Sequence, residues 1–321
     1  MKLGAFNIMF FDKELEEALE KIKSYGCDAV EIGSGGFTPK KHIDAAEFIK
    51  DDGKCRNLSK MIEKHGLFLS ALSCHANMLH PNKDFSFQHH NDFRDIVTLA
   101  GKLGVERVVT FAGCPGSSDN DSQPNWITCC WPDYFTETLN WQWEKKIIPF
   151  WKEEVNFARG KGVKMISLEM HPGDSVYNPE KLLKLREAVG EEIGCNFDPS
   201  HLFWQGINPI AAIRKLKDCI FHVHAKDSRV EPVIAQVNGV LDNKPYSDEF
   251  NRSWIFRTVG YGNSYEFWKD FVSTLRLVGY DYVLSIEHED SLLSSEEGLE
   301  KAVNFLREIM PTKPKGALWW D

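Results

Sequence analysis

The segment IGCNFDPSHLFWQGINPIAAIRKLKDCIFHVH (residues 193–224) contains two short apolar stretches separated by a helical pattern. IGCNFD (193–198) and CIFHVH (219–224) have the length of buried strands, and PIAAIRKLKD (209–218) repeats apolar residues at helical spacing. Two buried strands joined through a helix predict a βαβ unit with parallel strands. Both strands end in residues that apolar packing does not explain, Asp198 and His224.

The same alternation of strand and helix runs through the rest of the chain. The other predicted strands share an apolar character and are LGAFNI (3–8), AVEIG (29–33), LFLSALS (67–73), RVVTFAG (107–113), VKMISLEM (163–170) and YVLSIE (282–287). A helical pattern follows each of the eight strands, at residues 13–26, 57–66, 93–104, 134–161, 179–190, 209–218, 265–279 and 298–310. Eight such pairs predict one (β/α)₈ TIM barrel, an α/β fold, as a single domain over residues 1–321. A doubly wound sheet would need a phosphate turn after an early strand, but GSGG (33–36) lacks the GxGxxG spacing.

Four of the strands end in residue types that bind metal ions. The segments are SLEMHP with Glu169, NFDPSH with Asp198, FHVHAKD with His224 and SIEHED with Glu287. The carboxyl ends of all strands in such a barrel meet at one face, so these four side chains are expected at one site. Carboxylate and imidazole without thiolate suit one divalent ion, and we favour Mn²⁺ over Mg²⁺, Co²⁺ or Zn²⁺.

Each of these residues has a structural alternative when it is taken alone. A strand-end Asp such as Asp198 often caps the next helix, and a strand-end His often binds only backbone. Side chains alternate along a strand, which predicts that His171 faces the same way as Glu169, and His222 the same way as His224. We judge that four structural roles at this spacing are a poorer explanation than one metal site.

Composition excludes some classes of function. The chain has a formal net charge of −9, which disfavours binding to a nucleic-acid backbone. Its eight cysteines form no CxxC pair, its N-terminus reaches charged residues too soon for a secretory leader, and no apolar stretch approaches the length of a membrane span. We therefore expect a cytoplasmic protein with reduced thiols and no membrane contact.

Two long insertions follow strand ends and are expected on the side of the site. They comprise residues 114–133 after the fourth strand and 228–263 after the seventh. Long loops at this face commonly form lids or substrate walls. The residues that we expect to contact substrate there or nearby are His75, Lys226, Arg257 and Trp126. Most of the ten tryptophans are instead expected to pack helices on the barrel.

These strand-end motifs together resemble those of the xylose-isomerase-like sugar isomerase and epimerase barrels. They are E at the fifth strand, D-x-x-H at the sixth, H-x-H at the seventh and E at the eighth. The resemblance covers essentially the whole chain. It implies metal ligation by Glu169, Asp198, His224 and Glu287, and in the ketose 3-epimerases the two glutamates are also the acid/base pair. It further implies that His201, the histidine of D-x-x-H, touches substrate.

The chain departs from the compact epimerases in three ways. It has both insertions, it has Val230 where those epimerases place a substrate-binding arginine, and it has His171 beside Glu169. These features look more like the longer relatives that act on 3-keto-glycosides, including the large subunit of C-glycoside deglycosidases. That resemblance suggests His171 as a general base.

The chemistry common to these relatives is proton abstraction next to a carbonyl, with a divalent ion stabilising the enediolate. We therefore expect an isomerase or epimerase of a keto-sugar, and as the alternative a lyase that expels an aglycone from an oxidised glycoside. The partners expected are the small-molecule substrate and either further copies of the chain or a small second subunit. An abasic-site endonuclease and a non-catalytic sugar-binding barrel fit less well, because of the negative charge and the intact ligand set.

Overall fold

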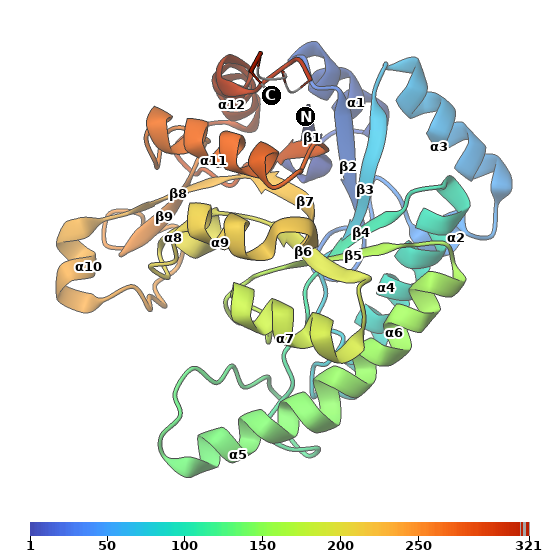
Figure 1. Cartoon of the computed structure of the whole chain (residues 1–321). Coiled ribbons are helices and arrows are strands. Elements are labelled where there is room, and N and C mark those ends of the chain that lie inside the picture. The colour runs from blue at the N-terminus through green and yellow to red at the C-terminus, as the bar shows by residue number, and fades with distance from the viewer. Residues whose placement is uncertain (315, 317–318, 321) are drawn as a thin grey trace.

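The predicted barrel is present in the computed structural model, which describes residues 1–314, 316 and 319–320. Eight parallel strands close on themselves in the order β1-β10-β7-β6-β5-β4-β3-β2 (Figure 1). The strands are β1 (Lys2–Phe6), β2 (Ala29–Gly33), β3 (Phe68–Cys74), β4 (Arg107–Thr110), β5 (Met165–Glu169), β6 (Ile193–Phe197), β7 (Ile220–Ala225) and β10 (Val283–Ile286). β2 and β6 are buried along their whole length, as expected for parallel strands that are covered on both faces. The α/β barrel fold is thus confirmed.

Helices surround the barrel on its outer face. The longer ones are α1 (Leu15–Ser24), α3 (Asp52–Lys64), α4 (Lys83–Leu103), α5 (Asp133–Trp141), α6 (Ile148–Gly160), α7 (Pro179–Val189), α9 (Pro209–Leu216), α11 (Tyr265–Leu277) and α12 (Ser295–Ile309). Short helical turns are α2 (Ala45–Phe48) and α8 (Ser200–Phe203). Asn178 and Asn208 cap α7 and α9, and a proline occupies the start of each of these helices.

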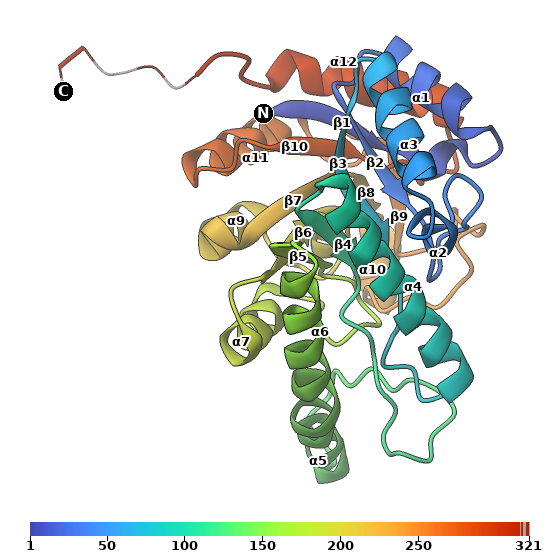
Figure 2. The same ribbon diagram turned by 90° about the vertical axis from the view of Figure 1, so that its right-hand side faces the viewer.

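Some predicted boundaries are wrong. α4 begins at Lys83 rather than at residue 93, because Asn82 caps it through the amides of Asp84 and Phe85. The fourth strand ends at Thr110 rather than at residue 113. There the chain turns through Gly113, which has a φ of 82°, and Cys114 N donates to Asn77 Oδ1. The predicted helix 134–161 is α5 and α6 joined by a π-helical segment, Gln142–Ile147, and it projects beyond the barrel in Figure 2.

Both predicted insertions lie between a strand end and the next helix. The first runs from the end of β4 to α5. The second contains an antiparallel pair, β8 (Asp227–Val230) with β9 (Trp254–Arg257), and the helix α10 (Pro232–Asn238). Asp227 fixes the segment in which the second insertion returns to the barrel. Its carboxylate accepts hydrogen bonds from the amides of Gly260, Gly262 and Asn263.

Several tryptophans pack the helices as predicted. Trp143, Trp151 and Trp268 are buried against the core. Trp204 and Trp254 stack on each other with ring centres 4.7 Å apart, whereas Trp131 is 74% exposed. All eight cysteines are free. Among the described residues, no helix combines the length and the apolar character needed to cross a membrane.

Candidate metal centre and substrate pocket

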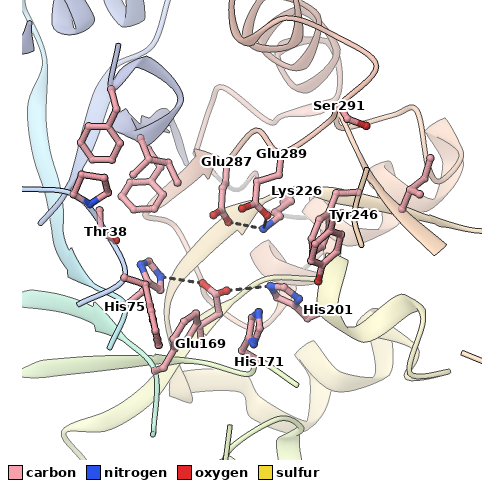
Figure 3. A pocket seen from close by; sticks show the side chains of 18 residues that line it. Thr38, His75, Glu169, His171, His201, Lys226, Tyr246, Glu287, Glu289 and Ser291 are labelled. Carbon is pink, nitrogen blue, oxygen red and sulfur yellow. Dashed lines mark hydrogen bonds and ion pairs between the residues drawn. The ribbon is translucent and has the colours of Figure 1, made fainter. Parts of the chain in front are cut away.

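A cavity of about 630 Å³ opens where the carboxyl ends of the barrel strands meet. Glu169, His171, His201, Lys226 and Glu287 lie on one part of its wall (Figure 3). Apolar side chains cover another part; they are Phe6, Ile8, Phe11, Phe37, Pro39 and Phe111. The cavity therefore combines charged groups with an extended apolar surface.

The four residues predicted as metal ligands come together at this cavity. One donor atom from each of Glu169, Asp198, His224 and Glu287 lies within 4.8 Å of the other three. Glu169 ends β5, His224 lies in β7, and Asp198 and Glu287 directly follow β6 and β10. All four side chains are buried. The register of the closed barrel thus delivers the ligands from strands that are up to 118 residues apart in sequence, from 169 to 287.

Buried ligand atoms that make no hydrogen bond among the described residues show that these residues fit a cation. Asp198 Oδ2, His224 Nδ1 and Glu287 Oε2 are buried and make no hydrogen bond to any described residue. His224 Nδ1 lies 3.1 Å from Glu169 Oε2 and 2.9 Å from Glu287 Oε2. Lys226 Nζ is an ion-pair partner of two of these atoms, at 3.2 Å from Glu287 Oε2 and 3.8 Å from Asp198 Oδ2. Carboxylates gathered this closely in a buried site repel one another, and a bound divalent ion would offset their charge. The donor set of three carboxylates and one imidazole suits a divalent ion and does not select among Mn²⁺, Mg²⁺, Co²⁺ and Zn²⁺.

Asp198 has one backbone contact in addition to its place in the ligand cluster. Its Oδ1 atom accepts a hydrogen bond from the amide of Ser200, the first residue of α8, but the N-cap position of that helix is Pro199 and not Asp198. Its Oδ2 atom remains for the ligand cluster. Burial raises the pKa of Asp198 to about 6, against the lowering influence of His201 and Lys226.

Glu169 is held by donors on several sides. Its Oε1 atom accepts a hydrogen bond from His201 Nε2 at 3.1 Å, and Oε2 accepts one from Asn196 Nδ2 at 2.8 Å. His75 Nε2 lies 3.4 Å from Oε2. Burial alone would raise the pKa of Glu169, but the imidazoles of His201, His224 and His75 hold it well below the ordinary value. Glu169 is therefore a carboxylate at neutral pH.

Glu287 is ionised for a different reason. Burial favours its neutral form, but the ammonium group of Lys226 and the imidazole of His224 outweigh burial and lower its pKa to about 2. Lys226 Nζ lies 3.2 Å from Glu287 Oε2 and also forms an ion pair with Glu289 (Figure 3). The lysine thus lines the cavity beside two members of the ligand cluster, Glu169 and Glu287.

His171 lines the cavity beside Glu169, as the alternation along the strand predicts. Its ring packs at 4.7 Å from the ring of Phe111 and at 4.3 Å from that of His201. Burial, together with the nearby His201, lowers the pKa of His171 to about 3. The imidazole of His171 is therefore neutral at neutral pH, and its low pKa makes it a weak base in the metal-free protein.

The residues predicted to contact substrate divide into two groups. His75, His201 and Lys226 line the cavity. Arg257 does not: it pairs with Asp290, at 3.1 Å, in the return of the second insertion. Trp126 lies away from the cavity, edge-on to Tyr177 with ring centres 5.4 Å apart. The substrate role of each residue stays a prediction.

Glu31 was not among the predicted site residues, although it lies directly behind the cluster. Glu31 is fully buried in β2, and its carboxylate accepts a hydrogen bond from His224 Nε2, which lies 3.1 Å from each of the two oxygens. Burial raises the pKa of Glu31, but His224 and His222 lower it by more, so this carboxylate is ionised. The sequence does contain a signal, because Glu31 is a charged residue in the middle of the apolar strand AVEIG (29–33).

Comparison with known proteins agrees with this geometry. The family model for the xylose isomerase-like TIM barrel matches residues 19–309. This chain belongs to that family. It is 40% identical to the uncharacterized protein YfiH of Bacillus subtilis (strain 168) over 313 residues, which is 97% of this chain and 99% of the relative.

Two solved structures share the fold. The crystal structure of IOLI protein with a binding zinc atom is 19% identical and has a TM-score of 0.64, with 96% of this chain and 98% of that chain covered. The 3-keto-D-glucoside 4-epimerase YcjR of E. coli is 15% identical and has a TM-score of 0.58, with 96% and 99% covered. At these identities the two matches show the barrel fold alone and leave the reaction open.

Proposed function

We propose that this protein is a divalent-metal-dependent isomerase or epimerase that removes the proton next to the carbonyl of a keto-sugar. The observation that carries the proposal is the convergence of four buried ligand residues, Glu169, Asp198, His224 and Glu287, at the wall of a large cavity. A metal site open to a cavity suits catalysis, because a substrate is able to reach the ion.

The ion would be held by Glu169, Asp198, His224 and Glu287, and it would supply Lewis acidity for the substrate carbonyl oxygen. Glu169 and Glu287 are our candidates for the acid/base pair. Both are ionised, and they come from β5 and β10, which β6 and β7 separate in the barrel. Two carboxylates that approach from different strands suit removal of a proton at one face and its return at another.

Neighbouring side chains are suited to orient the sugar. His201, His75 and Lys226 present donors at the same cavity wall. Lys226 is buried and cationic, so it would bind a substrate oxygen that gains negative charge as the proton leaves. Donors placed in advance around a developing charge contribute strongly to catalysis.

The position of His171 favours a second candidate, a lyase that expels an aglycone from a 3-keto-glycoside, as in the C-glycoside deglycosidase large subunit. His171 is a neutral imidazole that lines the cavity, and no role in holding the ion is proposed for it. The cavity volume of about 630 Å³ and its apolar wall also leave room for more than one sugar ring. The similarity to a 3-keto-D-glucoside 4-epimerase supports the same substrate class. For the quaternary structure we propose either a homo-oligomer or a complex with a small second subunit.

Solvent deuterium exchange tests the shared step. Chelator-treated protein is reloaded with Mn²⁺ and incubated in D₂O with free ketohexoses and with 3-keto-glucosides, and exchange at the carbon next to the carbonyl is followed by NMR. We expect exchange in the wild type and none in Glu287→Gln, with metal content measured in the same samples to separate loss of the base from loss of the ion. Unchanged exchange in a metal-loaded Glu287→Gln variant would overturn the role of Glu287. Release of free aglycone that stops in His171→Ala would select the lyase.

A further inference from the structure

A buried polar layer lies directly beneath the ligand cluster, inside the barrel. Its centre is Glu31, whose side chain is fully buried. The carboxylate accepts hydrogen bonds from the hydroxyls of Ser73 on β3 and Ser285 on β10, in addition to His224. A buried carboxylate with this many donors is held in one orientation.

The contact between Glu31 and His224 determines which ring nitrogen is free. A carboxylate only accepts, so the proton of the imidazole that faces Glu31 resides on Nε2. In a neutral imidazole this leaves the lone pair on Nδ1, the atom that lies 3.1 Å from Glu169 Oε2 and 2.9 Å from Glu287 Oε2. Phe6 stacks on the ring at 5.5 Å and 26°, which fixes its plane.

We propose that Glu31 is a positioning residue for the metal centre, which fixes the tautomer and orientation of His224 so that Nδ1 is presented to the ion. This role rests on the metal site of the proposed function. A metal-binding histidine commonly donates its second nitrogen to a carboxylate, and loss of such a partner typically weakens metal binding about 10- to 100-fold.

A second arm of the layer supports Glu169. Asn196 donates from Nδ2 to Glu169 and receives at Oδ1 the Nδ1 proton of His222, at 3.0 Å. The other nitrogen of His222 faces Glu31 Oε2 at 3.7 Å. The same layer therefore supports a ligand on β5 and a ligand on β7.

A second metal ion is the competing explanation for this layer. Glu31, His222 and His224 also bring ligand atoms within 4.8 Å of one another. An ion there would have to share Nε2 of His224, the atom whose proton bonds Glu31. The two explanations differ in the number of ions bound per chain.

Glu31→Gln tests the proposal, with Glu154→Gln as the matched control. Glu154 is equally buried but pairs with Arg94 and His90 between α4 and α6, outside the barrel. Mn²⁺ affinity is measured on chelator-treated protein by competition with a colorimetric chelator, and folding is checked by thermal unfolding. We expect one ion per chain, an affinity at least about tenfold weaker in Glu31→Gln, and an unchanged affinity in Glu154→Gln.

Two results would overturn the role of Glu31: unchanged affinity in Glu31→Gln, or two ions per wild-type chain. A wild type that binds no ion would instead refute the metal site of the proposed function, and this role with it. If Glu31→Gln does not fold, ¹⁵N NMR of wild-type protein loaded with Zn²⁺ decides. We expect the His224 proton on Nε2, and a proton on Nδ1 would refute the proposal.

Discussion

The Nδ1 atom of His224 lies 2.9 Å from Oε2 of Glu287, so two of the predicted metal ligands face each other directly. The two residues come from neighbouring strands, since β10 pairs with β7 through Ser285 opposite His224. The side chains of Asp198 and Glu169 converge at the same point. A divalent ion at this point would account for all of these contacts.

Ion binding should stabilise the fold. Three carboxylates lie close together in the metal-free protein, and a ligand that binds only the folded state stabilises it by RT ln(1 + [L]/Kd), about 2.7 kcal/mol at 100 times Kd. Differential scanning calorimetry should therefore give a higher Tm with Mn²⁺ than with a chelator. A Tm that does not respond to Mn²⁺ would count against the site.

Asp198→Asn should separate the two roles of Asp198. The side-chain oxygen of Asn still accepts from the amide of Ser200, so this contact is retained. The ligand charge is lost, and Mn²⁺ affinity should fall by tenfold or more. Asp198→Ala should lose both the affinity and the hydrogen bond to Ser200. Equal affinities of Asp198→Asn and wild type would exclude Asp198 as a ligand.

Metal affinity should decrease as the pH is lowered, because the ligands bind the ion in their deprotonated form. Burial opposes a charge on His224, but Glu31 and Glu287 raise the pKa of this imidazole well above the ordinary value. At neutral pH, metal binding would therefore have to displace a proton from His224. The pKa of Asp198 is about 6, so a second proton must leave below that pH and the decline should become steeper. Chelator competition between pH 5 and 8 measures this, and a flat profile would contradict it.

The stability of the metal-free protein should change with pH in the direction opposite to metal affinity. Protonation of Asp198 at lower pH should increase the free energy of unfolding. Its folded pKa of about 6 lies above the ordinary value of 3.8, so the folded state binds this proton more tightly than the unfolded state. This carboxyl therefore favours folding as pH falls from 7.5 toward 5 and costs stability as pH rises through 6. Urea unfolding at pH 7.5 and 5.5, compared between wild type and Asp198→Asn, isolates the effect. A pH dependence that is the same in both proteins would refute it.

His171→Ala should change catalysis without changing metal binding. The imidazole lines the cavity but is not in the ligand cluster, and general-base groups typically contribute 10² to 10⁴ in rate. We expect wild-type Mn²⁺ affinity and a fall in turnover of at least about 100-fold on the substrate that shows exchange. Full activity of His171→Ala would leave the glutamates as the only bases in the proposal.

The sequence predicts the barrel and the ligand set for one shared reason. Parallel strands buried on both faces are mostly apolar, so a charged residue or histidine at a strand end is conspicuous, and the barrel brings all strand ends together. Glu169, Asp198, His224 and Glu287 are found by this rule. The long insertions follow no such periodicity, which is why the positions of Arg257 and Trp126 did not follow from the sequence. Glu31 was missed because its partner His224 is 193 residues away and is reached only when the barrel closes.

Metal titration of the chelator-treated wild-type chain tests the central claim most directly. Isothermal titration with Mn²⁺, checked by elemental analysis after gel filtration, gives the number of ions bound per chain. The arrangement of the four ligands predicts one ion per chain, with binding lost or severely weakened in Asp198→Ala. A chain that binds no divalent ion, or that binds it equally well in Asp198→Ala, would contradict the account.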